Sequence, residues 1–119
     1  MSLGKLAVEI GDNGIKFDPH RVAAPDYAAR SLRELLPVLY RPPGDPGLSL
    51  NTPVYHMYRN IYAHEHGALL AEQRVRYDLT LIRPLCLGAE RAKTYGHYHP
   101  AAPGHTSSYP EIYQVIAGE

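Results

Sequence analysis

The sequence predicts a mainly β protein, chiefly from the pattern of its second half. From Val54 onward, apolar and polar residues alternate as they do along strands with one buried face. Turns rather than helices separate these alternating segments, which favours an antiparallel sheet or barrel. The length of 119 residues suits one compact domain. We divide it into an N-terminal arm, helix and connector at 1–53 and a β domain at 54–119.

The N-terminal part is expected to contain a strand, a turn and one helix. Leu6–Ile10 is predicted as a short strand, followed by a Gly-Asp-Asn-Gly turn at 11–14. A helix is predicted over about 26–40, because Asp26 can serve as its N-cap and apolar residues follow at helical spacing. That apolar stripe consists of Ala28, Ala29, Leu32, Leu35 and Leu36. The prolines and glycines of 41–53 cannot continue a helix, so we expect a connector there.

The second half is predicted to form four strands. These segments are Val54–Tyr62, Arg74–Pro84, Ala92–His99 and Ile112–Ala117. Successive side chains of a strand point to opposite sides, so Tyr55 and Met57 share one face of the first segment. His56 and Tyr58 share the other.

The overall composition argues against several classes of partner. Twelve basic residues balance twelve acidic ones, so the chain carries no electrostatic footprint for nucleic acid or an anionic membrane. No apolar run reaches the ~20 residues of a membrane span, and no secretion signal is recognisable. Cys86 is the single cysteine, which excludes an internal disulfide. These features fit a cytoplasmic protein.

Two histidines and a glutamate are the strongest candidates for chemistry. On a strand, His97 and His99 would lie on one face, about 6.5–7 Å apart along the backbone, within reach of one metal ion. Glu111 begins the next predicted strand, where a hairpin could bring its carboxylate beside them. Two imidazoles and one carboxylate suit iron(II), manganese or zinc. Taken alone, such a histidine pair is more often simply polar surface on a sheet edge.

Other residues also invite a functional interpretation. His64 and His66 form a second pair of this spacing, and with His56 they could make another metal site, although a loop or strand end is the simpler interpretation. Ten of the eleven aromatic residues are tyrosine. A tyrosine hydroxyl seeks a hydrogen-bonding partner when buried, so this surplus suggests polar ligand contacts.

The sequence around the histidines resembles the first motif of the cupin superfamily. Its elements are an upstream glycine, His97-x-His99, a variable loop, Glu111, six residues and Gly118. More narrowly, Thr94-x-Gly-His-x-His and Tyr109-Pro-Glu-x-Tyr-x-Val resemble the cupin-type glucose-6-phosphate isomerases. Val54-Tyr55 and Thr80-Leu-Ile-Arg-Pro84 also resemble that family in order and separation. The resemblance covers roughly residues 54 to 118.

This resemblance implies a cupin, or jelly-roll, β-barrel and a metal-dependent isomerase of glucose 6-phosphate and fructose 6-phosphate. It implies that His97, His99 and Glu111 hold a divalent metal, with iron(II) expected first and manganese, zinc or nickel as alternatives. Glu111 would also act catalytically, as the base that moves a proton; a direct hydride shift is the rival mechanism. The implied contacts to substrate phosphate are Tyr55, Thr80, Thr94, Gly96 and Tyr113. The expected partners are the sugar phosphate and a second copy, as a homodimer.

Part of the family pattern is missing. The family's fourth ligand is a histidine of a second, downstream motif, and this chain ends after the first. A jelly roll needs about eight strands, more than are predicted here. We therefore expect a truncated form with an incomplete barrel, weak metal binding and poor turnover. A non-catalytic sugar- or metal-binding cupin remains an alternative, as does another cupin enzyme, an oxygenase or a sugar epimerase.

Overall fold

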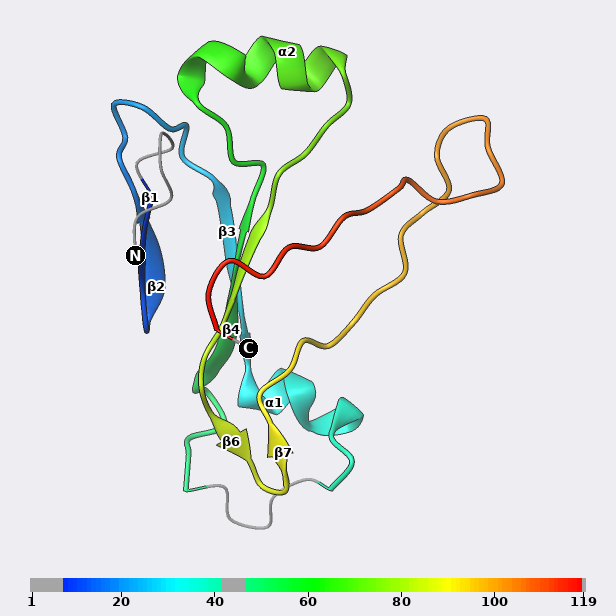
Figure 1. Cartoon of the computed structure of the whole chain (residues 1–119). Coiled ribbons are helices and arrows are strands. Elements are labelled where there is room, and N and C mark those ends of the chain that lie inside the picture. The colour runs from blue at the N-terminus through cyan, green and yellow to red at the C-terminus, as the bar shows by residue number, and fades with distance from the viewer. Residues whose placement is uncertain (1–7, 42–46, 119) are drawn as a thin grey trace.

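The computed structural model describes residues 8–41 and 47–118. Within these residues, short antiparallel strands form three separate sheets (Figure 1). The strands are β1 (Val8–Gly11), β2 (Gly14–Phe17), β3 (Asp26–Ser31), β4 (Pro53–Arg59), β5 (Leu79–Ile82), β6 (Cys86–Leu87) and β7 (Glu90–Arg91). The helical turns are α1 (Leu32–Leu35), η2 (Leu36–Val38), η3 (His64–His66) and α2 (Gly67–Glu72). The predicted mainly β fold is confirmed, and the described sheets do not close into a barrel.

Three parts of the sequence predictions lie outside the described residues. These are positions 6 and 7 of the first predicted strand, positions 42–46 of the connector, and Glu119.

The first hairpin forms around the predicted turn. β1 and β2 pair antiparallel, with Gly11 opposite Gly14, so the turn at 11–14 is confirmed. The hairpin is joined to the rest of the protein through Tyr58, whose hydroxyl accepts a buried hydrogen bond from the Ile15 N–H at 2.9 Å. The side chains of Val8 and Ile15 are buried beside it.

β4 is the central strand of a three-stranded sheet in the order β3-β4-β5. Both pairings are antiparallel, with Arg30 opposite Tyr55 and Thr80 opposite Met57. The strand predicted from Val54 is confirmed over most of its length. The one predicted at 74–84 forms over four residues, because the chain between β4 and β5 departs from the sheet and carries α2 (Figure 1).

The predicted helix at 26–40 is wrong over its first six residues. Residues Asp26–Ser31 form β3, and α1 begins at Leu32. The helix N-cap is Ser31 rather than Asp26: its backbone N–H and its hydroxyl both donate to the Glu34 carboxylate, at 2.8 and 3.0 Å. A tertiary contact explains why residues 26–31 form a strand instead of a helix. The exposed edge of β4 supplies a full set of ladder partners to 26–31, and such pairing overrides local helix propensity.

Two clusters of buried side chains form the core. The first, here called cluster A, lies between the first hairpin and the sheet; its buried members are Val8, Ile15, Val22, Tyr58, Ile61 and Leu79. The second, cluster B, lies between α1, β4 and β6; its buried members are Leu32, Leu35, Leu39, Val54, Tyr55 and Leu87. β4 contributes to both, so this strand connects the two halves of the core.

The two strands predicted at 92–99 and 112–117 do not form. Within the described residues no strand lies alongside either segment, and a strand is stable only when its backbone groups pair with a neighbour. Apolar side chains of the second segment are open to solvent: Ile112 is 94% exposed and Val115 is 74% exposed. None of the helices in the described residues has the length and apolar character needed to cross a bilayer.

Candidate functional site

The predicted site residues lie mainly on the segment that follows β7. Figure 1 shows this segment leaving the sheets, turning at its outer loop and returning toward β4. At its start, Ala92 packs against cluster B and donates its N–H to the Leu85 carbonyl at 2.8 Å. Near its end, Ile116 packs against cluster A. Both ends of the segment are thus attached to the core, and to different parts of it.

A turn in the outer loop reverses the chain between the two halves of the motif. Ala101 and Ser108 form an antiparallel bridge. Inside it, the Ala102 N–H donates to the Ser107 carbonyl at 3.0 Å. Because the chain doubles back here, residues before and after the turn come alongside each other.

His99 and Glu111 meet across this reversal. His99 Nε2 lies 2.7 Å from Glu111 Oε2, and the side chains are 28% and 37% exposed. His97 lies next to them, with its ring centroid 4.6 Å from that of His99 and the rings tilted by 57°. The three side chains form a cluster near the surface of the described residues rather than inside a barrel.

The environment of His99 is suited to a ligand of a metal ion. Its Nε2 is shielded from solvent, and despite its closeness to Glu111 it makes no hydrogen bond of acceptable geometry. Two ligand atoms bound to one tetrahedral ion at about 2.0–2.2 Å lie roughly 3.3–3.6 Å apart, so the two side chains, now 2.7 Å apart, would have to separate slightly to admit an ion. The fit is incomplete, however: among residues 8–41 and 47–118, no three histidine, cysteine or acidic side chains are arranged to hold a metal together.

Tyr113 interacts with the same carboxylate. A hydrogen bond from its hydroxyl to Glu111 is the main cause that raises the pKa of Tyr113, with smaller contributions from desolvation and from the Glu111 charge. The Tyr113 side chain is otherwise open, at 80% exposed. Its hydroxyl is therefore directed at Glu111, whereas the resemblance implied a contact to phosphate.

Tyr55 connects the sheet to the start of the motif. Its ring is buried in cluster B, at 4% exposed, and its hydroxyl accepts a hydrogen bond from the Tyr95 N–H at 3.3 Å. The bonded amide lies between Thr94 and Gly96, both of which are exposed. Gly96 has φ +83°, a left-handed conformation that favours glycine. Three of the predicted phosphate contacts are therefore gathered in one place.

Thr80 and Arg30 lie on the same face of the sheet as Tyr55. Thr80 is opposite Met57, two residues along β4 from Tyr55, while Arg30 is directly opposite Tyr55. Thr80 was predicted as a site residue, whereas Arg30 falls within the helix predicted at 26–40 and was not. The Ser-x-x-Glu capping box of Ser31 and Glu34 could have indicated that the helix starts after residue 30, but it does not indicate which residue of β4 lies opposite Arg30.

The other candidate histidines do not meet one another. His56 is buried on β4, where its Nδ1 lies 2.9 Å from the Tyr27 hydroxyl; burial chiefly, and then the charge of Arg83, lower the pKa of His56. The Nε2 of His64 is 3.0 Å from the Pro19 carbonyl. His66 lines a separate cavity beside α2.

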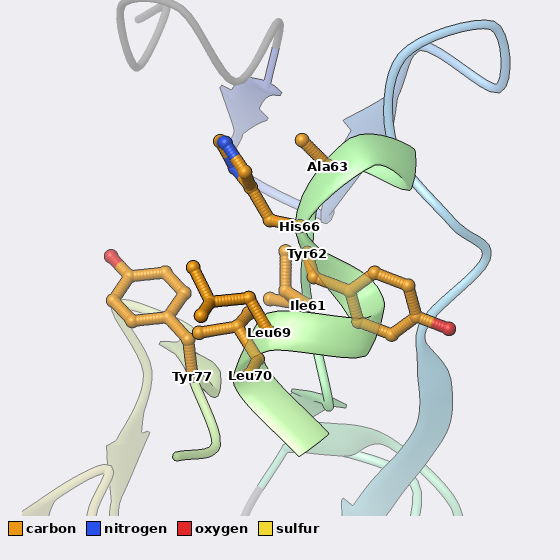
Figure 2. A pocket seen from close by; sticks show the side chains of 7 residues that line it. All are labelled: Ile61, Tyr62, Ala63, His66, Leu69, Leu70 and Tyr77. Carbon is orange, nitrogen blue, oxygen red and sulfur yellow. The ribbon is translucent and has the colours of Figure 1, made fainter. Parts of the chain in front are cut away.

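That cavity has a volume of about 320 Å³ and is shown in Figure 2. Its walls are mainly apolar, with Ile61, Leu69 and Leu70 on one side and Tyr77 and His66 on the others. The described residues that line it include no fixed positive charge, so it does not suit a sugar phosphate. The predicted metal ligands lie elsewhere, on the His97–Glu111 segment.

Comparison with known families identifies the family of the chain. A family model described as glucose-6-phosphate isomerase (GPI) matches residues 31–119. The chain belongs to this cupin-type isomerase family. The match contains β4, β5 and the whole segment with His97, His99 and Glu111. Searches of curated proteins and of solved structures gave no match.

Proposed function

We propose that this protein is a metal-dependent glucose-6-phosphate isomerase that interconverts glucose 6-phosphate and fructose 6-phosphate. The family match over residues 31–119 supports isomerase chemistry. The observation that carries the proposal at residue level is the approach of His99 Nε2 to Glu111 Oε2, at 2.7 Å and without a hydrogen bond. A nitrogen that is desolvated yet unsatisfied is costly unless another partner binds it. A divalent cation between the two groups would be such a partner.

The proposed metal ligands are His97, His99 and Glu111, with iron(II) as the expected ion and manganese, zinc or nickel as substitutes. A bound divalent ion supplies Lewis acidity, which polarises the carbonyl oxygen of the sugar. His97 supports this set because its ring lies beside that of His99, with centroids 4.6 Å apart, so a small side-chain movement would bring it to the same ion. Such rotamer changes are common when a ligand binds.

Glu111 is the proposed base. In the direction of fructose 6-phosphate, its carboxylate takes a proton from C2 of the sugar and returns it to C1. Tyr113 is the neighbouring side chain that interacts with this carboxylate. The rest of the substrate is held by its phosphate, through the hydroxyls of Tyr55, Thr80 and Thr94 and the N–H of Gly96.

The proposal includes a cytoplasmic protein that acts as a homodimer. In the described residues, the outer edges of β3 and β5 have no strand partner, and Ile112 and Val115 are exposed. Unpaired edges and exposed apolar residues are the features that a second copy would cover. Sedimentation velocity on the purified chain tests this part, since a monomer at micromolar concentration contradicts it.

The main experiment is an isomerase assay with matched variants. The purified chain is depleted of metal and assayed anaerobically with glucose 6-phosphate after addition of iron(II) or manganese. We expect turnover that depends on the metal, and a loss of kcat/KM of about 100-fold or more in His99→Gln and Glu111→Gln. The control is His20→Gln, at an exposed position whose backbone alone is hydrogen-bonded to Asp18. Equal activity in all four proteins would refute the assignment.

A second assay addresses the route of the hydrogen. In D2O, proton transfer through Glu111 introduces deuterium at C1 of the fructose 6-phosphate formed. A direct hydride shift introduces none, and would remove the role of Glu111 as base while leaving its role as ligand.

A non-catalytic sugar phosphate-binding protein is the second candidate. It is favoured by one observation, the lack of a three-ligand metal arrangement among the described residues. Calorimetric binding of glucose 6-phosphate without any turnover, at saturating metal, would support this candidate instead.

A further inference from the structure

Arg30 is a cation placed beside the residues that we assign to phosphate binding. It lies directly opposite Tyr55 in the β3–β4 ladder, so the two side chains emerge on the same face, about 4.5–5.5 Å apart at Cβ. The Tyr55 hydroxyl in turn is bonded to the Tyr95 N–H at 3.3 Å. Arg30 is thereby connected, through one side chain, to the segment that contains Thr94 and Gly96.

The guanidinium group of Arg30 has more N–H donors than the partners found for it among the described residues. Its Nη1 donates to Glu34 Oε1 at 2.7 Å. This bond, with a smaller contribution from the Tyr55 hydroxyl, raises the pKa of Arg30. A guanidinium carries five N–H donors. Among the described residues, Glu34 and Tyr55 are the partners found for them, and the Arg30 side chain is 47% exposed.

Glu34 can release Arg30 without losing its own role. Its second oxygen, Oε2, accepts from the backbone and the hydroxyl of Ser31 and so caps α1. The Arg30 bond uses only Oε1 and joins two half-exposed groups. An exposed ion pair of this kind contributes little to stability, so a competing anion can replace it at small cost.

Lys93 is another cation on this part of the chain, and it is a weaker candidate. It lies next to Thr94, but its ammonium is 2.7 Å from Glu90. The Glu90 carboxylate also accepts from the Tyr40 backbone, which ties this pair to the chain after η2. An ammonium has three donors and no planar fork, so it matches phosphate less well than a guanidinium does.

We propose that Arg30 binds the phosphate group of the sugar phosphate, exchanging Glu34 Oε1 for phosphate oxygens. The inference rests on the proposed function, to which it adds the one full positive charge that the predicted phosphate contacts lack. Two parallel N–H···O bonds from the guanidinium, with the Tyr55 hydroxyl beside them, hold the dianion and select phosphorylated over free sugars. Arg30 acts in binding, far from the bonds that change.

The test compares four variants in binding and in turnover. Arg30→Met should weaken glucose 6-phosphate binding, measured by calorimetry, and raise KM, each by about 10- to 100-fold, with a smaller change in kcat. Arg30→Lys should recover part of the loss. The matched control is Arg33→Met, an exposed arginine of α1, which should stay within about twofold.

Glu34→Gln is the variant that separates binding from a structural role of the ion pair. Glutamine at this position still serves the capping box with Ser31, but it removes the charge that competes with phosphate. We expect Glu34→Gln to bind glucose 6-phosphate several-fold more tightly than wild type. If Arg30 served only to stabilise α1, Glu34→Gln would bind no better than wild type, and that result overturns the inference.

The outcomes for the two proposals are distinct. Wild-type protein that binds glucose 6-phosphate without converting it defeats the proposed isomerase but leaves the Arg30 effect measurable by calorimetry. Turnover by wild type, with Arg30→Met indistinguishable from Arg33→Met, defeats the Arg30 inference alone. Failure of wild type to bind glucose 6-phosphate at all defeats both. Circular dichroism and the melting temperature of each variant confirm that it is folded.

Discussion

Replacement of Tyr58 by phenylalanine is the sharpest test of how the first hairpin is attached to the sheet. The Tyr58 ring packs against Phe17 and Tyr27, with centroids 5.5 and 5.2 Å away. Phenylalanine keeps these ring contacts and removes one atom group, the hydroxyl that accepts the Ile15 N–H at 2.9 Å. The substitution therefore isolates a single buried hydrogen bond.

The loss of stability depends on the Ile15 N–H, which has no acceptor once the Tyr58 hydroxyl is removed. Tyr58 and Ile15 are 8% and 9% exposed, so the Ile15 N–H has little access to water after the substitution. An unsatisfied buried donor costs about 1–3 kcal/mol. The unfolding entropy of a chain of 119 residues is roughly 250 cal/mol/K, so we expect the melting temperature to fall by about 4–12 °C.

Thermal unfolding followed by circular dichroism measures the shift, and hydrogen exchange locates it. The Ile15 amide should lose protection more than the amides of β4, because the bond holds the hairpin rather than the central strand. Tyr77→Phe is the control, since Tyr77 is 40% exposed and should change by less than about 0.5 kcal/mol. If the Tyr58→Phe protein has the same melting temperature as the Tyr77→Phe control, the Tyr58 hydroxyl does not help to hold the first hairpin on the sheet.

Three further predictions concern the core, the capping box and the motif. Leu32→Ala should cost about 2–5 kcal/mol in chemical denaturation, because Leu32 is fully buried in cluster B; Leu36→Ala, partly buried, should cost less. The hydrogen bonds from Ser31 and Arg30 lower the pKa of Glu34 to about 2, from its usual 4.5. The ionised Glu34 carboxylate therefore stabilises the folded protein above pH 4.5, and this stabilisation is lost as the pH falls toward 2. Melting curves from pH 6 to 2 should show a shallower decline for Glu34→Gln than for wild type, and parallel curves contradict this. Gly96→Ala places a side chain at φ +83° and should destabilise by about 1 kcal/mol, measured by urea unfolding, whereas an unchanged midpoint would mean that the backbone relaxes there.

Local patterns were sufficient where the structure depends on local chemistry. The Gly-Asp-Asn-Gly segment predicted the turn of the first hairpin, and Gly11 and Gly14 face each other there. The alternation after Val54 predicted β4, which is buried along most of its length because it receives strands on both sides. In these cases the sequence period and the tertiary environment favour the same structure.

Predictions failed where a distant partner determines the outcome. Residues 26–31 include two alanines and an arginine, which favour a helix, yet they pair with β4 and form a strand. The opposite failure occurs at 92–99 and 112–117, where alternation favours strands but neither segment pairs with a strand of the described residues. Alternation describes one strand and contains no information about its neighbour.

The candidate site, too, could be predicted from the sequence only in part. The spacing of His97 and His99 and the turn-forming loop before Glu111 suggested that these residues could meet, and His99 and Glu111 lie 2.7 Å apart. Their roles as ligands stay predictions. Arg30 could not be recognised, because its place beside Tyr55 depends on the register of β3 against β4, and a one-residue slip would send it to the other face.

The attachment of the site segment explains how its parts can be brought together without strands. Ala92 packs on cluster B and Ile116 on cluster A, and β4 is common to both clusters. The segment is therefore a long loop with fixed ends, closed once more by the Ala101–Ser108 bridge. Each closure reduces the conformations left to the residues between, so less entropy is lost when His99 and Glu111 bind one ligand. In the proposed function, the free energy of metal binding supplies the remaining order, including the movement of His97.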